Sequence, residues 1–152
     1  IRTLREFPNT RLVVCGDAIS YKLFESISEN RRVFIPKVPD DELPYVLAQM
    51  DLLLVPLNTS PFHMMTHDRV LLQAGVRKIP WIASPMPDFK MWDSGGVTAD
   101  KPEEWHSYLR QFIQDPELRA SLGLAGFKKA LQRENRELAT KWLSTIRCIN
   151  QS

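Results

Sequence analysis

The chain has 152 residues, a length that suits a single domain. Hydrophobic residues make up 43% and charged residues 25%, which is ordinary for a soluble globular protein and excludes a disordered tail, a collagen-like repeat and a coiled-coil rod. The net charge of +2 is too small, and the basic residues are too dispersed, to indicate binding to nucleic acid. No apolar run approaches the roughly 18 residues that span a bilayer, so the sequence does not indicate membrane association.

The two cysteines, Cys15 and Cys148, lie at opposite ends of the chain. They form neither a disulfide framework nor a zinc motif, which favours a reducing compartment and predicts a cytoplasmic location. Cys15 closes an apolar run, so we expect its thiol to be buried.

Four apolar runs predict the strands of the fold, at residues 12–15, 33–35, 52–55 and 81–83. They do not alternate with polar residues, and strands of this kind are buried on both faces in parallel sheets covered by helices. The spacing between them leaves room for one crossover helix each. A fifth, weaker strand is predicted at residues 95–99.

The first predicted helices lie between these strands. Asp40 or Asp41 can cap a helix that has Pro44 in its first turn, where the missing N–H costs little. The apolar face of this helix follows the spacing i, i+3, i+4, i+7 and consists of Leu43, Val46, Leu47 and Met50. A second helix, over residues 66–76, is expected to be well buried because of its apolar residues Val70, Leu71, Leu72 and Ala74.

Beyond residue 99 the pattern becomes purely helical. Asp100 with Glu103 resembles a capping box, and Asp115-Pro116 is typical of a helix start. Gly123 and Gly126 in the latter helix either weaken it or indicate close packing. The apolar stripes of the three C-terminal helices are Trp105, Leu109, Phe112 and Ile113, then Leu118 and Leu122, then Leu138, Trp142 and Ile146. We therefore predict an α/β domain with a doubly wound parallel sheet and C-terminal helices.

His63 and His67 stand at i and i+4, the spacing of the zinc motif His-Glu-x-x-His. The glutamate of that motif is replaced by Met64, and no third ligand is evident. We therefore predict no metal site and favour a polar junction between a loop and a helix.

The segment 56–69 leaves the third predicted strand, crosses a polar loop and enters a helix. Ligands of open α/β sheets bind outside the carboxyl ends of the strands, where helix N-termini suit phosphate. Thr66, His67 and Arg69 could add donors to a diphosphate. Gly16, directly after the first strand, would let a ligand approach the backbone closely, although a simple turn explains it equally well.

Seven segments follow one another in a characteristic order along nearly the whole chain: residues 12–17, 33–43, 50–57, Pro61-Phe62 with Asp68, 79–85, Glu104-Trp105 and 115–119. This series resembles the C-terminal donor-binding domain of GT-B fold glycosyltransferases of the family 4 (group 1) type.

The resemblance implies that this domain binds a nucleotide-diphosphate sugar, for retaining transfer of the hexosyl type. It further implies that the loop at 36–39, including Val38, meets the base, and that the helix near Thr66 points its N-terminus at the diphosphate. Such enzymes generally need no bound metal, so no cofactor is expected. The implied donor-binding residues are Gly16, Val38, Phe62, Thr66, His67, Arg69 and Gln73. No catalytic base is predicted.

The chain departs from the family pattern in the donor motif. Gln73 replaces the glutamate that holds the ribose, Val70 replaces a basic residue, and Lys78 replaces a glycine. Either Arg69 and His67 substitute for the lost contacts, or the domain is a non-catalytic relative that serves as a structural or interaction module. The resemblance also implies a fragment, residues 1–152, that lacks the first strand of the donor domain and the separate N-terminal acceptor domain, and that is not active alone.

Overall fold

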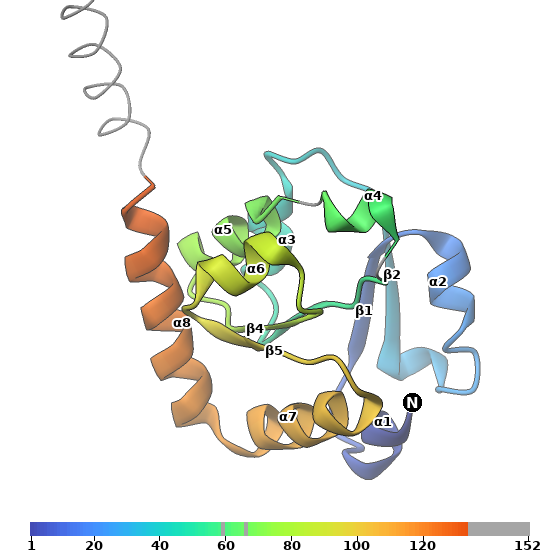
Figure 1. Ribbon diagram of the computed structural model, residues 1–152. Helices are drawn as coiled ribbons and strands as arrows, with labels where there is room; N and C mark the ends of the chain where they lie inside the picture. Colours follow the sequence, from blue (N-terminus) through green and yellow to red (C-terminus); the bar gives the residue numbers. More distant parts are fainter. Residues whose placement is uncertain (59, 66, 134–152) are drawn as a thin grey trace, which may run out of the picture.

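The computed structural model describes residues 1–58, 60–65 and 67–133 (Figure 1). Its strands are all parallel and form two hydrogen-bonded groups. In the first group β1 (Leu12–Gly16) pairs with β2 (Arg32–Pro36). In the second group β4 (Trp81–Ala83) lies between β3 (Leu53–Val55) and β5 (Gly96–Thr98). All the predicted strands, including the weaker fifth one, are therefore confirmed.

Helices connect the strands and follow the last one. Their bounds are α1 (Arg2–Glu6), α2 (Ala18–Lys22), the 3-10 turn η1 (Glu29–Arg31), α3 (Leu43–Leu47), α4 (Pro61–Met64), α5 (Arg69–Val76), α6 (Pro87–Trp92), α7 (Pro102–Gln114) and α8 (Pro116–Leu131). The predicted α/β class with C-terminal helices is confirmed. The last predicted helix, with Leu138, Trp142 and Ile146, and also Cys148, lie outside the described residues. Of the helices that the structure describes, none is long and apolar enough to span a bilayer.

The central strand β4 divides the core into two layers, because successive side chains of a strand point to opposite faces. Trp81 and Ala83 pack with residues of α5 and α6, among them Leu71 and Phe89. Ile82 points the other way and packs with Phe112 of α7. Figure 1 shows α5 and α6 on one side of β4 and β5 and α7 on the other, as a doubly wound sheet requires.

The other strands are less buried than their sequences predict. All three residues of β4 are fully buried, whereas β3 is half-buried throughout. In β1 the apolar residues are half-buried and Cys15 is exposed. The prediction of a buried Cys15 thiol is therefore wrong, and strands buried on both faces are found only at β4 in the described part of the chain.

Two predicted helix starts are wrong. The N-cap of α3 is Glu42, not Asp40 or Asp41, and the helix ends at Leu47, so that Met50 follows it in a turn. The helix predicted over 66–76 begins only at Arg69, and the short helix α4 precedes it.

The predicted capping box of α7 is shifted by one residue. Lys101 is the N-cap, and the carboxylate of Glu104 accepts hydrogen bonds from the backbone N–H groups of Asp100 (2.9 Å) and Lys101 (3.3 Å). These two backbone donors lower the pKa of the Glu104 carboxyl. The start of α8 is as predicted, since the Asp115 side chain accepts from the backbone N–H of Leu118 at 2.8 Å.

Glycines let α8 pack closely against its neighbours, which confirms the packing interpretation of Gly123 and Gly126. A Cβ atom at Gly75 of α5 would lie 2.8 Å from the carbonyl oxygen of Gly126. A Cβ atom at Gly123 would collide with the carbonyl oxygen of Lys78. Lys78 itself has a left-handed backbone, with φ of 58°, at the position where the family pattern has glycine.

The N-terminal helix α1 is held against α7. Glu6 forms ion pairs with His106 (3.0 Å) and Arg110 (3.1 Å) of α7. The guanidinium of Arg31 donates to the carbonyl oxygens of Leu4 (2.6 Å) and Phe7 (2.8 Å). The ion pairs of Glu6 thus hold α1 against α7, and the bonds of Arg31 join α1 to the segment directly before β2.

Candidate functional site

The carboxyl ends of parallel strands meet at one edge of a sheet, and the loops after β3 and β4 are fixed to each other there. The backbone N–H of Leu57 donates to the hydroxyl of Ser84 at 2.9 Å, and the N–H of Ser84 donates to the carbonyl of Val55 at 3.0 Å. Ser84 is one of the few buried polar residues. These hydrogen bonds therefore fix the two loops at the edge of the sheet near which α5 begins.

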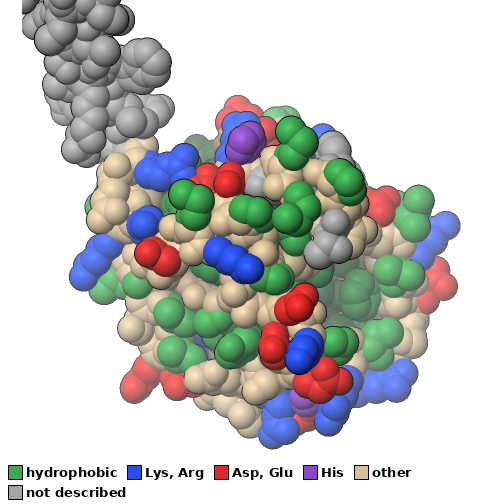
Figure 2. All heavy atoms as spheres, viewed as in Figure 1, with side chains coloured by type: hydrophobic (Ala, Val, Ile, Leu, Met, Phe, Trp, Pro, Cys, Tyr) green, Lys and Arg blue, Asp and Glu red, His purple; other side chains and the backbone are tan. Residues whose placement is uncertain are grey.

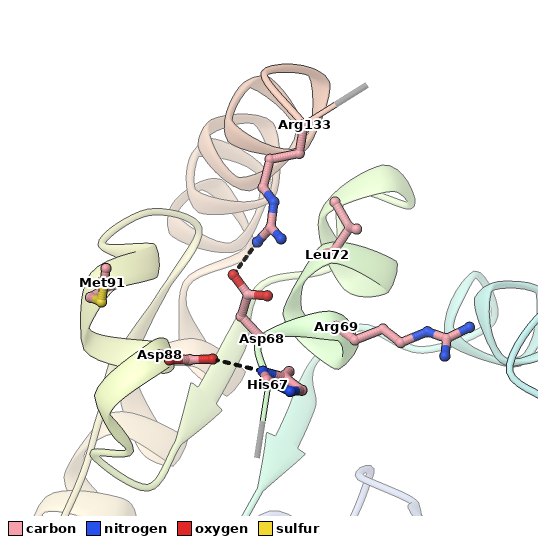
Figure 3. Close-up of a pocket in the computed structure, with 7 residues that line it drawn as sticks. All are labelled: His67, Asp68, Arg69, Leu72, Asp88, Met91 and Arg133. Atoms are coloured by element: carbon pink, nitrogen blue, oxygen red, sulfur yellow. Dashed lines mark hydrogen bonds and ion pairs between the residues drawn. The ribbon is translucent and has the colours of Figure 1, made fainter. Parts of the chain in front are cut away.

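Helix α5 starts at this edge, and the side chain of its N-cap residue, Asp68, does not cap the helix. The side chain of Asp68 makes no hydrogen bond to the first turn of α5. Its carboxylate instead accepts from the guanidinium of Arg133, which follows α8 (Figure 3). The positive end of the α5 dipole therefore lacks the usual side-chain acceptor, although the charge of Asp68 remains beside it.

Two residues of α5 bind the loop that follows β2. The guanidinium of Arg69 lies 2.7 Å from the carboxylate of Asp40, and the amide of Gln73 donates to the carbonyl oxygen of Asp40 at 2.6 Å. Val38, half-buried, lies two residues before Asp40 in this loop. The structure therefore brings two of the predicted site residues, Arg69 and Gln73, together on the loop that also contains Val38.

A pocket of about 490 Å³ lies on the other side of the α5 N-terminus. His67 and Asp88 pair across it at 3.3 Å. In Figure 3 the side chain of Arg69 points away from Asp68 and Arg133, toward the α3 side. The lining residues of this pocket are His67, Asp68, Arg69, Leu72, Asp88, Met91 and Arg133.

The cationic groups around the α5 N-terminus are matched by carboxylates. Arg69 pairs with Asp40 and Arg133 pairs with Asp68. His67 pairs with Asp88 when it is protonated. Figure 2 shows acidic and basic side chains interspersed with apolar ones over this face of the molecule. An anionic ligand would therefore compete with carboxylates that are already in place.

The other predicted site residues, Gly16, Phe62 and Thr66, belong to other segments of the chain. Gly16 ends β1 with φ of 118°, and a Cβ atom there would meet nothing within 4 Å, so the backbone is open to approach. Phe62 lies in α4. Thr66 falls outside the described residues.

The two histidines do not form the face that the zinc spacing requires, because α4 ends at Met64 and His67 lies beyond it. The ring of His63 lies 2.5 Å from the side-chain oxygen of Asn58, whereas His67 lies against Asp88. Within residues 1–58, 60–65 and 67–133 no group of three potential metal ligands lies together.

Sequence reasoning missed the acidic partners Asp40 and Asp88 in their observed roles, and it missed Arg133. The sequence places Asp40 directly after the loop at 36–39, but its pattern there predicts a helix cap and not a partner for Arg69. Nothing in the sequence connects Arg133 with Asp68, which lies 65 residues earlier.

No protein-family model and no curated protein matches the chain. Solved structures do match, and three are representative. HepE of Anabaena, in complex with UDP, has a TM-score of 0.72 at 20% identity over 94% of this chain and 43% of its own. Sucrose-phosphate synthase of Thermosynechococcus elongatus has a TM-score of 0.74 at 16% identity over 99% of this chain and 41% of its own. The C-terminal domain of a group 1 glycosyl transferase, LpcC of Francisella tularensis, has a TM-score of 0.67 at 17% identity over 87% of this chain and 73% of its own.

The chain thus spans about two fifths of the length of the first two of these proteins. The third match is to a C-terminal domain alone, which locates the similarity within such enzymes. The chain has the fold of the C-terminal domain of GT-B glycosyltransferases.

Proposed function

We propose that the chain is the donor half of a glycosyltransferase and binds a nucleotide-diphosphate sugar for transfer to an unidentified acceptor. The observation that carries the proposal is the direct contact of Arg69 and Gln73 with the loop after β2, at the carboxyl edge of the sheet. Ligands of open α/β sheets bind at this edge. HepE, which shares the fold, has been crystallised with UDP and with UDP-glucose.

The proposal assigns to the residues at this edge the task of stabilising the diphosphate that leaves when the sugar–diphosphate bond breaks. In the transfer, the bond between the anomeric carbon and the diphosphate oxygen breaks, a bond to the acceptor oxygen forms, and the proton of the acceptor hydroxyl passes to the leaving diphosphate. Negative charge then builds up on the leaving diphosphate. In this proposal Arg69 and the N-terminus of α5 stabilise that charge without a metal ion, and the Gln73 amide hydrogen-bonds the ribose.

A second candidate function, a non-catalytic module with the same fold, is favoured by one observation. The two arginines at the α5 N-terminus already face carboxylates, and Gln73 is engaged by the carbonyl of Asp40. A domain that has lost its donor would keep such contacts, because they join α5 to the loop after β2 and to α8.

Calorimetric titration with UDP, GDP and ADP separates these functions. For the donor domain, one nucleotide binds at millimolar concentration or below, and Arg69→Ala weakens this binding at least tenfold. Arg11→Ala, which removes an exposed arginine before β1, serves as the matched control and leaves the affinity unchanged. If a folded chain binds none of the three nucleotides, the donor function is wrong and the non-catalytic function is favoured.

A further inference from the structure

We propose that Arg133 is a positioning residue for the donor diphosphate, a role that it fulfils by neutralising Asp68 at the N-terminus of α5. This inference rests on the proposed function, because it concerns the same site. Arg133 follows the end of α8, and its guanidinium forms an ion pair with the Asp68 carboxylate (Figure 3). Neither residue belongs to the donor-binding set that the family resemblance implies.

The carboxylate of Asp68 is the one that would act most strongly on an anion at this helix end. Its side chain is 18% exposed, against 60% for Asp40 and 41% for Asp88. Water screens a charge less effectively when the charge is partly buried. Asp68 is also the N-cap residue, so its charge lies directly beside the first turn of α5. Without a cation beside it, this carboxylate would repel a diphosphate that binds the helix N-terminus.

The side chain of Asp68 is held away from the first turn of α5. Its backbone angles, φ of −72° and ψ of 10°, differ from the extended conformation in which an N-cap side chain normally reaches the helix. The carboxylate makes no hydrogen bond to the first turn and accepts from Arg133 instead. The Asp68 carboxylate therefore does not take the place of a ligand at this helix end.

The other cations that line the pocket have carboxylate partners of their own. Arg69 lies 2.7 Å from Asp40, and in Figure 3 its side chain points away from Asp68. His67 lies 3.3 Å from a carboxylate of α6. Among the residues that line this pocket, Arg133 is therefore the one that neutralises Asp68.

Contacts with α6 and the residue after it fix the position of Arg133. Its guanidinium carbon lies 5.8 Å from the centre of the Trp92 ring, a distance at which the face of an indole attracts a cation. Trp92 is fully buried and therefore offers a rigid surface. About one turn earlier on α8, the ammonium of Lys129 lies 3.1 Å from the carboxylate of Asp93. Because Arg133 is held in advance, its pairing with Asp68 costs less conformational entropy than the pairing of a free surface arginine.

If Arg133 acts through Asp68, the affinity for a diphosphate follows the net charge of the pair. The pair is neutral in the chain as it stands. Arg133→Gln leaves one net negative charge, Asp68→Asn leaves one net positive charge, and the two substitutions together restore neutrality. The interaction with a ligand is proportional to the charge of that ligand. The effect should therefore be larger for a nucleoside diphosphate than for the corresponding monophosphate.

Calorimetric titration of the 152-residue chain tests this charge dependence. The ligands are the diphosphate that binds best among UDP, GDP and ADP, and the monophosphate of the same nucleoside. Arg133→Gln should weaken diphosphate binding about fivefold and monophosphate binding about twofold. Asp68→Asn should strengthen diphosphate binding, and the double variant should bind within about twofold of the unaltered chain.

Arg110→Gln is the matched control, because it makes the same charge change in an ion pair elsewhere. Arg110 pairs with Glu6 at 3.1 Å, and its side chain is 46% exposed, as is that of Arg133. It belongs to α7, which packs on the other face of the sheet from α5 (Figure 1). Arg110→Gln should leave the affinity for both ligands unchanged.

The role of Arg133 is overturned if Arg133→Gln weakens the binding of both ligands equally, or leaves both unchanged. It is also overturned if the double variant binds no better than Arg133→Gln, or if Arg110→Gln causes an equal loss. Asp68→Asn must by itself bind the diphosphate more tightly than the unaltered chain, so the test does not depend on the folding of Arg133→Gln. A folded chain that binds none of the three nucleotides contradicts the proposed function and this inference together. Failure of the variant pattern in a chain that does bind a nucleotide contradicts this inference alone.

Discussion

The carboxylate of Asp40 lies 2.7 Å from the guanidinium of Arg69, and this ion pair joins the loop after β2 to the first turn of α5. Both side chains are about 60% exposed, so the pair contributes little to stability. Its significance is that it occupies the arginine that the donor function needs.

Replacing Asp40 by asparagine should therefore strengthen nucleotide binding. The substitution releases Arg69 from its carboxylate, and an exposed pair worth at most about 1 kcal/mol corresponds to a gain of up to about fivefold in affinity. Calorimetry with the nucleotide that binds best measures this gain. Asp41→Asn makes the same charge change one residue further on and should have a smaller effect; equal effects would mean that Arg69 is not the group released.

Ser84→Ala should destabilise the chain by about 1–2 kcal/mol. The buried hydroxyl accepts from the backbone N–H of Leu57, and its removal leaves that donor without a partner away from water. Chemical denaturation measures the loss. Ser107→Ala, on an exposed position of α7, is the control and should change the free energy of unfolding by less than about 0.5 kcal/mol. A neutral Ser84→Ala would show that the loop after β3 does not depend on this bond.

Lys78→Gly should stabilise the chain by about 0.5–1 kcal/mol. The left-handed backbone at φ of 58° costs a side-chain-bearing residue about 1–2 kcal/mol, and the greater freedom of glycine in the unfolded chain takes back part of the gain. Thermal unfolding measures the shift. Val76→Gly, two residues earlier within α5, should instead destabilise by about 1 kcal/mol. The same sign for both substitutions would contradict the strained backbone at Lys78.

Gly123→Ala should destabilise the chain by about 2 kcal/mol, although glycine to alanine in a helix normally stabilises by about 1 kcal/mol. The new methyl group would collide with the carbonyl oxygen of Lys78, and overpacking of this kind costs about 1–3 kcal/mol or more. Ser121→Ala, exposed on the same helix, is the control and should be neutral or slightly stabilising. Stabilisation by Gly123→Ala would disprove the close approach of α8 to Lys78.

Glu104→Gln should lower the melting temperature at neutral pH and have no such effect in acid. The pKa of Glu104 is lowered below its ordinary value of 4.5 by the backbone donors of Asp100 and Lys101, so the charged carboxylate stabilises the fold. For a lowered folded-state pKa, that contribution is present above the unfolded pKa and is lost as the pH falls through the folded pKa. The melting temperatures of the two proteins, measured from pH 7 down to acid, should begin to converge as the pH falls below 4.5 and should meet only below the folded-state pKa of Glu104. Glu103→Gln serves to subtract the effect of the helix dipole; a difference that persists in acid would contradict the assignment.

The sheet could be predicted from the sequence because its strands are unbroken apolar runs separated by crossover lengths. The start of α8 was equally predictable, since Asp115 and Pro116 determine a cap locally. The start of α5 was not, because the cap residue Asp68 bonds to Arg133 from a distant helix instead of to its own first turn. Local patterns identify local hydrogen bonds, and they fail where tertiary partners compete for the same side chain.

In the candidate site, too, local residues could be predicted from the sequence, whereas their tertiary partners could not. The resemblance selected Arg69 and Gln73, and the structure places both against one loop, although their role toward a donor stays a prediction. The acidic partners could not be foreseen, because Asp40 and Asp88 approach α5 through crossovers of the chain. The exposure of Cys15 was unpredictable for a related reason: an apolar run indicates a strand but not which elements cover each of its residues.

Because α8 packs closely through Gly126, it holds Arg133 at a fixed distance from that contact. Gly126 anchors it backbone to backbone against Gly75, and its last residue is followed closely by Arg133 at the α5 N-terminus. One residue inserted between the two would advance the arginine by about 1.5 Å and turn it by about 100° around the helix axis. Asp68 would then lose its partner while the core remained intact. The number of residues between Gly126 and Arg133 therefore determines whether the charge of Asp68 is neutralised, although neither residue belongs to α5.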